Sequence, residues 1–276
     1  MVRDPDDTAG WRAIVGRYAK LGTMSDAIPP RPDPYESHPP PAAPVSPVPA
    51  ASWRPLEAIP VFVIAVILAF LLGSIVVVLV KPCAPQFVLT TLVGELAFAL
   101  AVLGWVRFVD HGPMAALGAP RRPLLDLGSG VLTGAALVAI GGIVLAIDRG
   151  VAMRILGHAP EEPQQVVTCV RGAALAYLAP VVILVAPFGE ELLFRGFLYK
   201  GLRRRLSSWP AAIVSGLAFG SVHYAGVSFL LLIPALVVVG VGLAWVYERR
   251  QSVLASMAAH ATFNLVGYLS IAMSRH

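Results

Sequence analysis

The sequence predicts an all-α fold, a polytopic bundle of transmembrane helices behind a disordered Pro-rich N-terminal tail. Hydrophobic residues make up 57% of the 276 residues, only 13% are charged, and the mean hydropathy is +0.75. An average soluble domain carries about 25% charged residues, so this chain has too few to surround a soluble core. The apolar residues also gather in runs of roughly 20, the length that crosses a bilayer as a helix.

The first element is a tail, residues 1–55, which we expect to be flexible and cytoplasmic. Its second half, from Pro29 to Pro55, contains the runs PPRPDP and PPPAAP. Proline at this density favours extended polyproline II structure and cannot form a packed core. Two readings stay open, a disordered tether and a docking segment for a proline-binding partner. We expect the rest of the chain, residues 56–276, to form the transmembrane domain.

Apolar runs follow the tail, and we expect about seven membrane spans. The break between the fifth and sixth runs, around Ala225 to Ser228, is weak, so counts of six and eight stay open. No internal repeat of the kind found in transporters is evident. The runs are residues 58–80, 86–106, 126–147, 173–198, 211–225, 228–246 and 252–273.

Basic residues between the runs predict the orientation in the membrane. Lys and Arg are enriched in cytoplasmic loops, and placing the N-terminus in the cytoplasm puts most of them inside. The net charge of +5 therefore indicates topology, and we expect no nucleic-acid partner. The inner residues would be Arg54, Arg107, Arg121, Arg122, Lys200, Arg203, Arg204, Arg205, Arg249 and Arg250, and the outer ones Lys81, Arg149, Arg154, Arg171 and Arg275.

Two cysteines, Cys83 and Cys169, both fall in loops on the predicted outer side. They are too few for a disulfide framework or for a cysteine-ligated metal site. An oxidising periplasm would allow them to pair, and the alternative of two free thiols stays open.

Ionisable and amide side chains interrupt the later apolar runs. Glu190 and Glu191 lie in the fourth run, His223 in the fifth, and His260 and Asn264 in the seventh. A charged group is costly to hold at membrane depth, so such residues usually face a protein interior and have a function there. Their recurrence in successive runs predicts one buried site.

Helical spacing suggests different roles for the two glutamates. Successive helix residues are about 100° apart, so Glu190 and Glu191 point in different directions. Arg195 lies one turn after Glu191, the spacing at which helix side chains pair. We therefore expect an ion pair between Glu191 and Arg195, which leaves Glu190 for catalysis. The reverse assignment of the glutamates and a purely structural pair both stay open.

The later polar residues also occur one helical turn apart. Phe219 precedes His223 by one turn and could pack beside its ring. His260 and Asn264 share one face, and imidazole and amide donors at this spacing suit a developing oxyanion. Taken alone, each pair could instead bond a neighbouring helix. Glu95, halfway along the second run, could likewise make a structural hydrogen bond or line a substrate cavity.

Together these motifs resemble those of the CPBP family of intramembrane proteases, the CAAX proteases and bacteriocin-processing enzymes, also called Abi. That family shows two adjacent glutamates with an arginine four positions after the second, then Phe-x-x-x-His, then His-x-x-x-Asn or a similar residue in place of the Asn. The resemblance covers roughly residues 85–276. The chain carries the three motifs in order as Glu190-Glu191-x-x-x-Arg195, Phe219-x-x-x-His223 and His260-x-x-x-Asn264.

The resemblance implies an intramembrane endopeptidase that hydrolyses a peptide bond of a membrane-associated, prenylated or peptide substrate within the lipid bilayer. Glu190, helped by His223, would activate a water molecule, and no cofactor would be needed. His260 and Asn264 would stabilise the oxyanion. The supporting residues would be Glu191, Arg195 and Phe219. The site should open toward the cytoplasm, because Glu190 and His260 lie toward the inner ends of their runs.

Three alternatives stay open. Glu190, His223 and His260 could hold zinc with a fourth position for water, although the HExxH signature is absent. The chain could be a non-proteolytic membrane scaffold or a bacteriocin self-immunity protein, or a transporter that uses its carboxylates as a proton relay. A composition rich in Ala, Val and Arg favours a bacterium, so we expect a multi-pass protein of the bacterial inner membrane.

Overall fold

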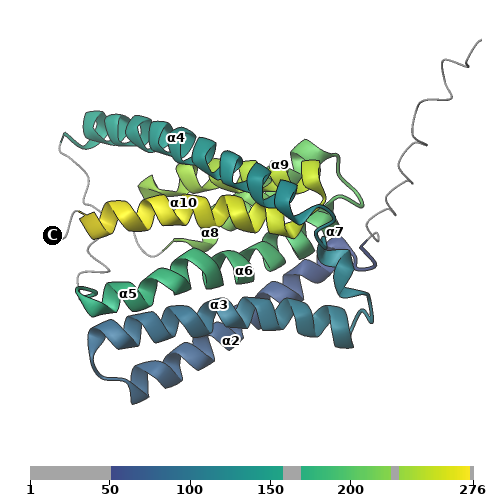
Figure 1. The fold of residues 1–276 in the computed structure, drawn as a ribbon, viewed down its shortest axis with the longest axis horizontal. Coiled ribbons are helices and arrows are strands. Elements are labelled where there is room, and N and C mark those ends of the chain that lie inside the picture. The colour runs from purple at the N-terminus through teal and green to yellow at the C-terminus, as the bar shows by residue number, and fades with distance from the viewer. Residues whose placement is uncertain (1–50, 158–168, 225–229, 274–276) are drawn as a thin grey trace, which may run out of the picture. The chain divides into compact units, whose positions relative to one another are not determined.

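The all-α prediction is confirmed by the computed structural model of the chain, which describes residues 51–157, 169–224 and 230–273. Helices account for nearly all of these residues, and the described parts contain no strand (Figure 1). The predicted weak break at Ala225 to Ser228 lies outside the described residues, as does nearly all of the predicted tail.

Four helices in the described parts are long and apolar enough to cross a membrane. They comprise α2 (Ala58–Leu79) with the short turn Pro55–Glu57 before it, α3 (Cys83–Phe108), α4 (Pro123–Leu156) and the continuous helix Ala173–Leu202. Three further helices complete the bundle: α8 (Ser208–Val222), which is apolar but shorter, α9 (Ile233–Arg250) and α10 (Val253–Met273). A helical membrane bundle is therefore present, and the count of seven spans stays a prediction.

Helix α4 extends well beyond the predicted run 126–147. It begins at Pro123, a residue suited to the first helical turn, and continues for 34 residues to Gly157, whose φ of 74° ends it. Its second half carries Asp148, Arg149 and Arg154, which end an apolar run but not a helix. Helix α8, in contrast, ends at Val222, before the end of the predicted run 211–225. His223 therefore lies at the C-terminal cap of the helix and not within it.

The long helix Ala173–Leu202 is irregular on both sides of the two glutamates. It contains α5 (Ala173–Pro180), a π-helical segment (Val181–Val185), α6 (Ala186–Glu191), a second π-helical segment (Leu192–Tyr199) and α7 (Lys200–Leu202). π-Helical turns are rare and occur frequently at functional sites. Pro180 and Pro187 lack the backbone N–H that a regular helix would use, which disturbs the hydrogen-bond ladder in this region.

Side chains from other elements bond carbonyl groups in the π-helical segments. Asn264 donates to the carbonyl of Val182 at 2.8 Å in the first segment. In the second, Ser215 donates to the carbonyl of Phe194 at 3.1 Å. Trp53 donates to the carbonyl of Phe197 at 2.9 Å. These bonds tie the irregular helix to its neighbours on both sides of Glu190 and Glu191.

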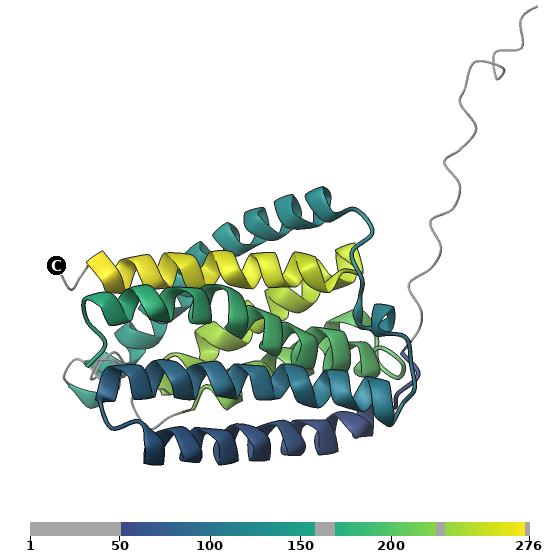
Figure 2. The same ribbon diagram turned by 60° about the horizontal axis from the view of Figure 1, so that its bottom comes forward.

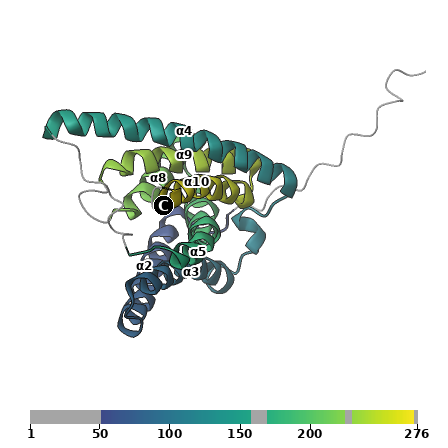
Figure 3. The same cartoon turned by 60° about the vertical axis from the view of Figure 1, so that its left-hand side comes forward.

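Helix α10 occupies the middle of the bundle, with α4 and α9 on one side and α5 and α6 on the other (Figures 1 and 3). Helices α2 and α3 form an antiparallel pair beside the long helix (Figure 2). Glycines allow the closest contacts, because a Cβ at Gly134 of α4 would overlap the backbone of α10 at Ala259. Gly216 of α8 and Gly240 of α9 meet in the same way.

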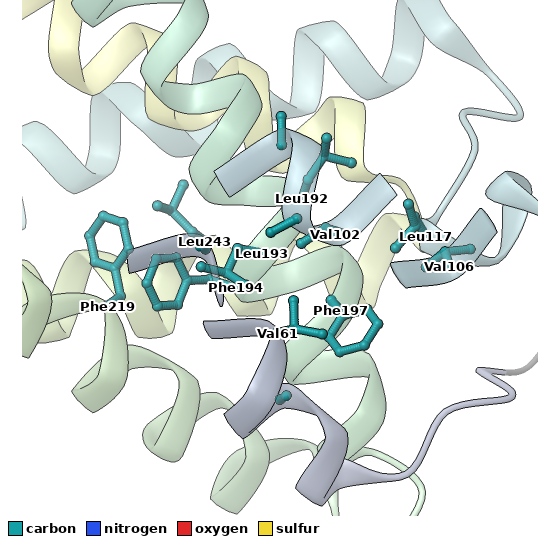
Figure 4. Close-up of a cluster of buried hydrophobic side chains, with 14 of the residues drawn as sticks. Val61, Val102, Val106, Leu117, Leu192, Leu193, Phe194, Phe197, Phe219 and Leu243 are labelled. Atoms are coloured by element: carbon teal, nitrogen blue, oxygen red, sulfur yellow. The ribbon is translucent and has the colours of Figure 1, made fainter. Parts of the chain in front are cut away.

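The main hydrophobic core surrounds the second π-helical segment and includes Leu193, Phe194 and Phe197 (Figure 4). Trp53 belongs to this core, with no exposed surface and its ring stacked 4.7 Å from that of Phe197. Arg204 donates to the carbonyl groups of Ser52 and Trp53. Trp53, which lies within the predicted tail, is therefore packed against the bundle.

A disulfide joins Cys83, at the start of α3, to Cys169, in the segment that leads into α5. The open question of their pairing is thereby answered. The bond lies at the end of the bundle where α3 and α5 begin and α10 ends.

Candidate active site

The two glutamates of α6 face different surroundings, as their helical spacing predicts. Glu191 has no exposed surface, and its Oε1 accepts a hydrogen bond from Nη1 of Arg195 at 2.7 Å, which confirms the predicted ion pair. Arg195 is equally buried and donates from Nη2 to the carbonyl of Gly240 at 2.9 Å. Glu190 keeps 8% of its side chain exposed and faces a cavity.

Glu191 also orients His260, a contact that the sequence did not reveal. Nδ1 of His260 lies 2.9 Å from the Oε1 that Arg195 contacts. A nitrogen facing a carboxylate carries the proton in the neutral ring, which leaves Nε2 with its lone pair. That Nε2 lies 3.9 Å from Oε2 of Glu190. Glu191 therefore connects the ion pair to the imidazole that faces Glu190.

His223 faces the other oxygen of Glu190 in the same manner. Its Nδ1 lies 2.8 Å from the carbonyl oxygen of Phe219, which can only accept, so Nδ1 carries the proton. Its Nε2 lies 3.9 Å from Oε1 of Glu190. Each imidazole thus faces a different oxygen of one carboxylate. A separation of 3.9 Å is too long for a direct hydrogen bond and fits a bridging water molecule.

Phe219 holds both imidazoles in place. Its ring centroid lies 4.9 Å from that of His223, the predicted contact, and 5.5 Å from that of His260. The guanidinium of Arg195 lies 4.6 Å from the same ring centroid. Phe219 is almost completely buried, so these groups have one common packing partner. Its role is wider than the single contact that the sequence suggested.

The cavity beside Glu190 has a volume of about 350 Å³. Most of its polar lining comes from Glu190, His223, Asn264 and Glu95. His260 is not among the described lining residues, and only 3% of its surface is exposed. Apolar residues of α3, α5 and α10 form the remaining wall.

The cavity extends in the direction opposite to the one predicted. We expected an opening toward the cytoplasmic end, where the Lys and Arg residues cluster. The lining residues Phe87, Leu175 and Ile271 lie instead toward the end that carries the disulfide. Core residues around Phe194 and Phe197 lie on the predicted side of Glu190, a packing arrangement that position along the sequence does not reveal.

Asn264 lies one turn after His260 on α10, as predicted, and lines the cavity. It already donates one amide proton to the carbonyl of Val182 at 2.8 Å. This bond fixes the orientation of the amide and leaves its second proton for a ligand. The first π-helical segment therefore positions Asn264. No sequence motif indicated this contact between the two helices.

Zinc would need at least three ligands around one point. Both imidazoles present Nε2 to Glu190 while Nδ1 is held by another acceptor, which is how histidine ligands are usually oriented. Across the described ranges, however, no three His, Cys, Asp or Glu side chains are arranged to hold a metal ion. The donor types therefore suit zinc, and their arrangement does not.

Comparison with known proteins points to the same part of the chain. A family model described as "Type II CAAX prenyl endopeptidase Rce1-like" matches residues 172–266, which contain all three motifs. The Bacillus subtilis protein named "Putative membrane peptidase YdiL" is 28% identical over 135 residues, 46% of this chain and 53% of that protein. "UPF0177 protein YxdF" of Lactococcus lactis is 32% identical over 84 residues, 30% of this chain and 44% of that protein.

The chain spans about half the length of the curated relatives it matches. No solved structure matches it. The resemblance to the CPBP family, predicted from the motifs, is confirmed by the family model and fits both relatives. With helices suited to a bilayer, these findings support a membrane protein of the peptidase class.

Proposed function

We propose that this chain is an intramembrane endopeptidase in which Glu190 activates the attacking water. One observation carries the proposal: Glu190 lies in the wall of a cavity with an imidazole Nε2 3.9 Å from each of its two oxygens. A water molecule bound there would contact the carboxylate of Glu190, as the base, and an imidazole Nε2, as a second hydrogen-bond acceptor. The match to a CAAX prenyl endopeptidase family supports the same reaction class.

The first step is attack by this water on the scissile amide. Glu190 takes one proton of the water, while Nε2 of His223 accepts a hydrogen bond from the other and orients the oxygen. The carbonyl of Phe219 keeps His223 in the tautomer that this role needs. General base catalysis by a positioned side chain contributes typically about 10²–10⁴ in rate.

The oxyanion formed in this step needs hydrogen-bond donors. Asn264 offers the amide proton that Val182 does not use. His260 can donate from Nε2 only as the imidazolium ion, because Nδ1 is already held by Glu191. Removing one oxyanion donor typically costs about 10²–10³ in kcat.

The proposed substrate is a membrane-associated peptide or prenylated protein that reaches the site within the bilayer. The largely apolar wall of the cavity suits a segment with apolar side chains. We place the chain in the bacterial inner membrane with its N-terminus in the cytoplasm, and we propose a proline-binding partner for the tail as a secondary role.

Purified protein in detergent, tested against a peptide library, addresses the reaction. Glu190→Gln should lower peptide-bond cleavage by at least about 10²-fold. Glu57→Gln is a matched control, because Glu57 lies outside the cavity. Equal cleavage by the wild type and Glu190→Gln would refute the assigned base. If the wild type cleaves no peptide, the scaffold or self-immunity alternative is favoured.

Exhaustive chelation separates the glutamate mechanism from the zinc alternative. We expect full activity after chelation, because the arrangement of Glu190, His223 and His260 does not suit a metal ion. Activity that is lost on chelation and restored by added zinc would establish the metal mechanism instead.

A further inference from the structure

A second carboxyl group faces Glu190 across the cavity. Glu95 lies halfway along α3, and its side chain lines the same cavity as Glu190 and His223. The carbonyl oxygen of Glu95 lies against Gly189, the residue before Glu190, so the two carboxyl groups start from neighbouring backbone positions. Oε2 of Glu95 and Oε2 of Glu190 are both buried without a hydrogen-bond partner. Unpaired buried oxygens of this kind are rare in folded proteins and call for an explanation.

The backbones of α3 and α6 hold these two side chains together. A Cβ at Gly189 would overlap the carbonyl oxygen of Glu95, so only glycine permits this approach. The neighbouring Gly94 has open space around it, so the close contact is confined to one side of α3. The helix packing therefore places Glu95 beside the residue that precedes Glu190.

The described wall of the cavity offers little positive charge to these two buried carboxyl groups. Among the described lining residues there is no Lys or Arg and His223 is the one imidazole, while His260 approaches Glu190 from outside the lining, with Nε2 3.9 Å from Oε2. Two carboxylates at close range in a buried site repel each other, so such pairs usually carry one proton between them. Paired carboxyl groups of this kind divide the acid and base roles in other hydrolases.

We propose that Glu95 is the general acid that protonates the leaving nitrogen, an inference that rests on the peptidase function proposed above. Neither imidazole is left for that step, because a neutral ring keeps its one proton on Nδ1 and the imidazolium form of His260 is assigned above to the oxyanion. The Nδ1 proton of His223 is held by Phe219, and that of His260 by Glu191. Among the described residues of the cavity wall, Glu95 is the remaining acid.

The proton transfers balance over one turnover. Water adds to the carbonyl carbon, its proton passes to Glu190, and the carbonyl electron pair moves onto oxygen. The oxyanion then collapses to a carboxyl group, the C–N bond breaks, and the nitrogen takes the proton of Glu95. Glu190 returns its proton to Glu95, which restores the starting state with one carboxylic acid and one amine released.

The test compares two substrates with the same acyl peptide, one a peptide amide and the other a nitrophenyl ester. Nitrophenolate leaves without protonation, so only amide cleavage needs the acid. Glu95→Gln should lower kcat for the amide by about 10²–10⁴ and for the ester by far less, and Glu95→Asp should restore part of the loss. Equal losses for both substrates, or no loss for the amide, would overturn the proposal.

Glu190→Gln separates this outcome from failure of the proposed function, because loss of the base should abolish cleavage of amide and ester alike. A wild type that cleaves neither substrate, or a Glu190→Gln variant that cleaves both, would refute the proposed peptidase function itself. A further pair of variants tests the geometry. Gly189→Ala should lower the amide-to-ester ratio by pushing α3 away, and Gly94→Ala should leave it unchanged; identical ratios would contradict the role of Glu95.

Discussion

Replacing Arg195 by methionine should strongly destabilise the protein. The guanidinium has no exposed surface and makes hydrogen bonds to Glu191 at 2.7 Å and to the carbonyl of Gly240 at 2.9 Å. Methionine fills a similar volume but supplies neither donor. Glu191 would be left in the core with His260 as its remaining ionisable partner.

Breaking a buried ion pair by removing one partner costs about 3–5 kcal/mol, because the other charge stays uncompensated. Removing both charges avoids that penalty, and such replacements are often neutral or stabilising. The double variant Glu191→Gln/Arg195→Met should therefore be more stable than Arg195→Met and close to the wild type.

Activity should not recover in the double variant. The substitution Glu191→Gln puts an amide in place of the carboxylate that holds Nδ1 of His260, so the imidazole would lose its fixed tautomer. We therefore expect peptide cleavage to stay well below the wild-type rate. Stability and catalysis should therefore separate.

Denaturant unfolding in mixed micelles measures the stability difference, and peptide cleavage measures the activity. Arg122→Met, at an exposed arginine before α4, is the control for loss of a positive charge. An Arg195→Met variant as stable as the wild type would refute the reasoning, as would a double variant no more stable than the single one.

Three further expectations concern packing. Gly134→Val should lower the thermal unfolding midpoint in detergent because it would separate α4 from α10, whereas Gly128→Val, with open space around it, should not. Reductant should cost the wild type about 2–5 kcal/mol of stability and leave a Cys83→Ser variant unaffected, a comparison that unfolding curves measure directly. Phe219→Leu should lower kcat by about 10-fold or more with little change in KM, because the two imidazoles lose their common contact; unchanged kcat would exclude a positioning role.

Much of the fold follows from the length of the apolar runs. Helices α2, α3 and α10 begin and end within a few residues of the predicted bounds. Helix α4 differs because charged residues at a membrane surface continue a helix as readily as apolar ones. The π-helical segments escaped prediction, since they depend on side chains such as Ser215 that reach them from other helices.

In the site too, contacts within one helix could be predicted from the sequence, and contacts between helices could not. The Glu191–Arg195 pair and the contact of Phe219 with His223 follow from residues one turn apart on a single helix. The second contact of Glu191, with His260, depends on how α6 and α10 pack, and the sequence does not give that register. The direction of the cavity was wrong for a related reason. The position of Glu190 along its helix does not show on which side of it the neighbouring helices leave a cavity.

The bond between Cys83 and Cys169 bears on where a substrate is met. Disulfides persist in the periplasm and are reduced in the cytosol, so we expect this rim of the bundle to face outward, in agreement with the arginine-rich loops at the other rim. The cavity beside Glu190 extends toward the same end of the bundle. In that orientation a polypeptide already exported across the membrane would meet this cavity directly.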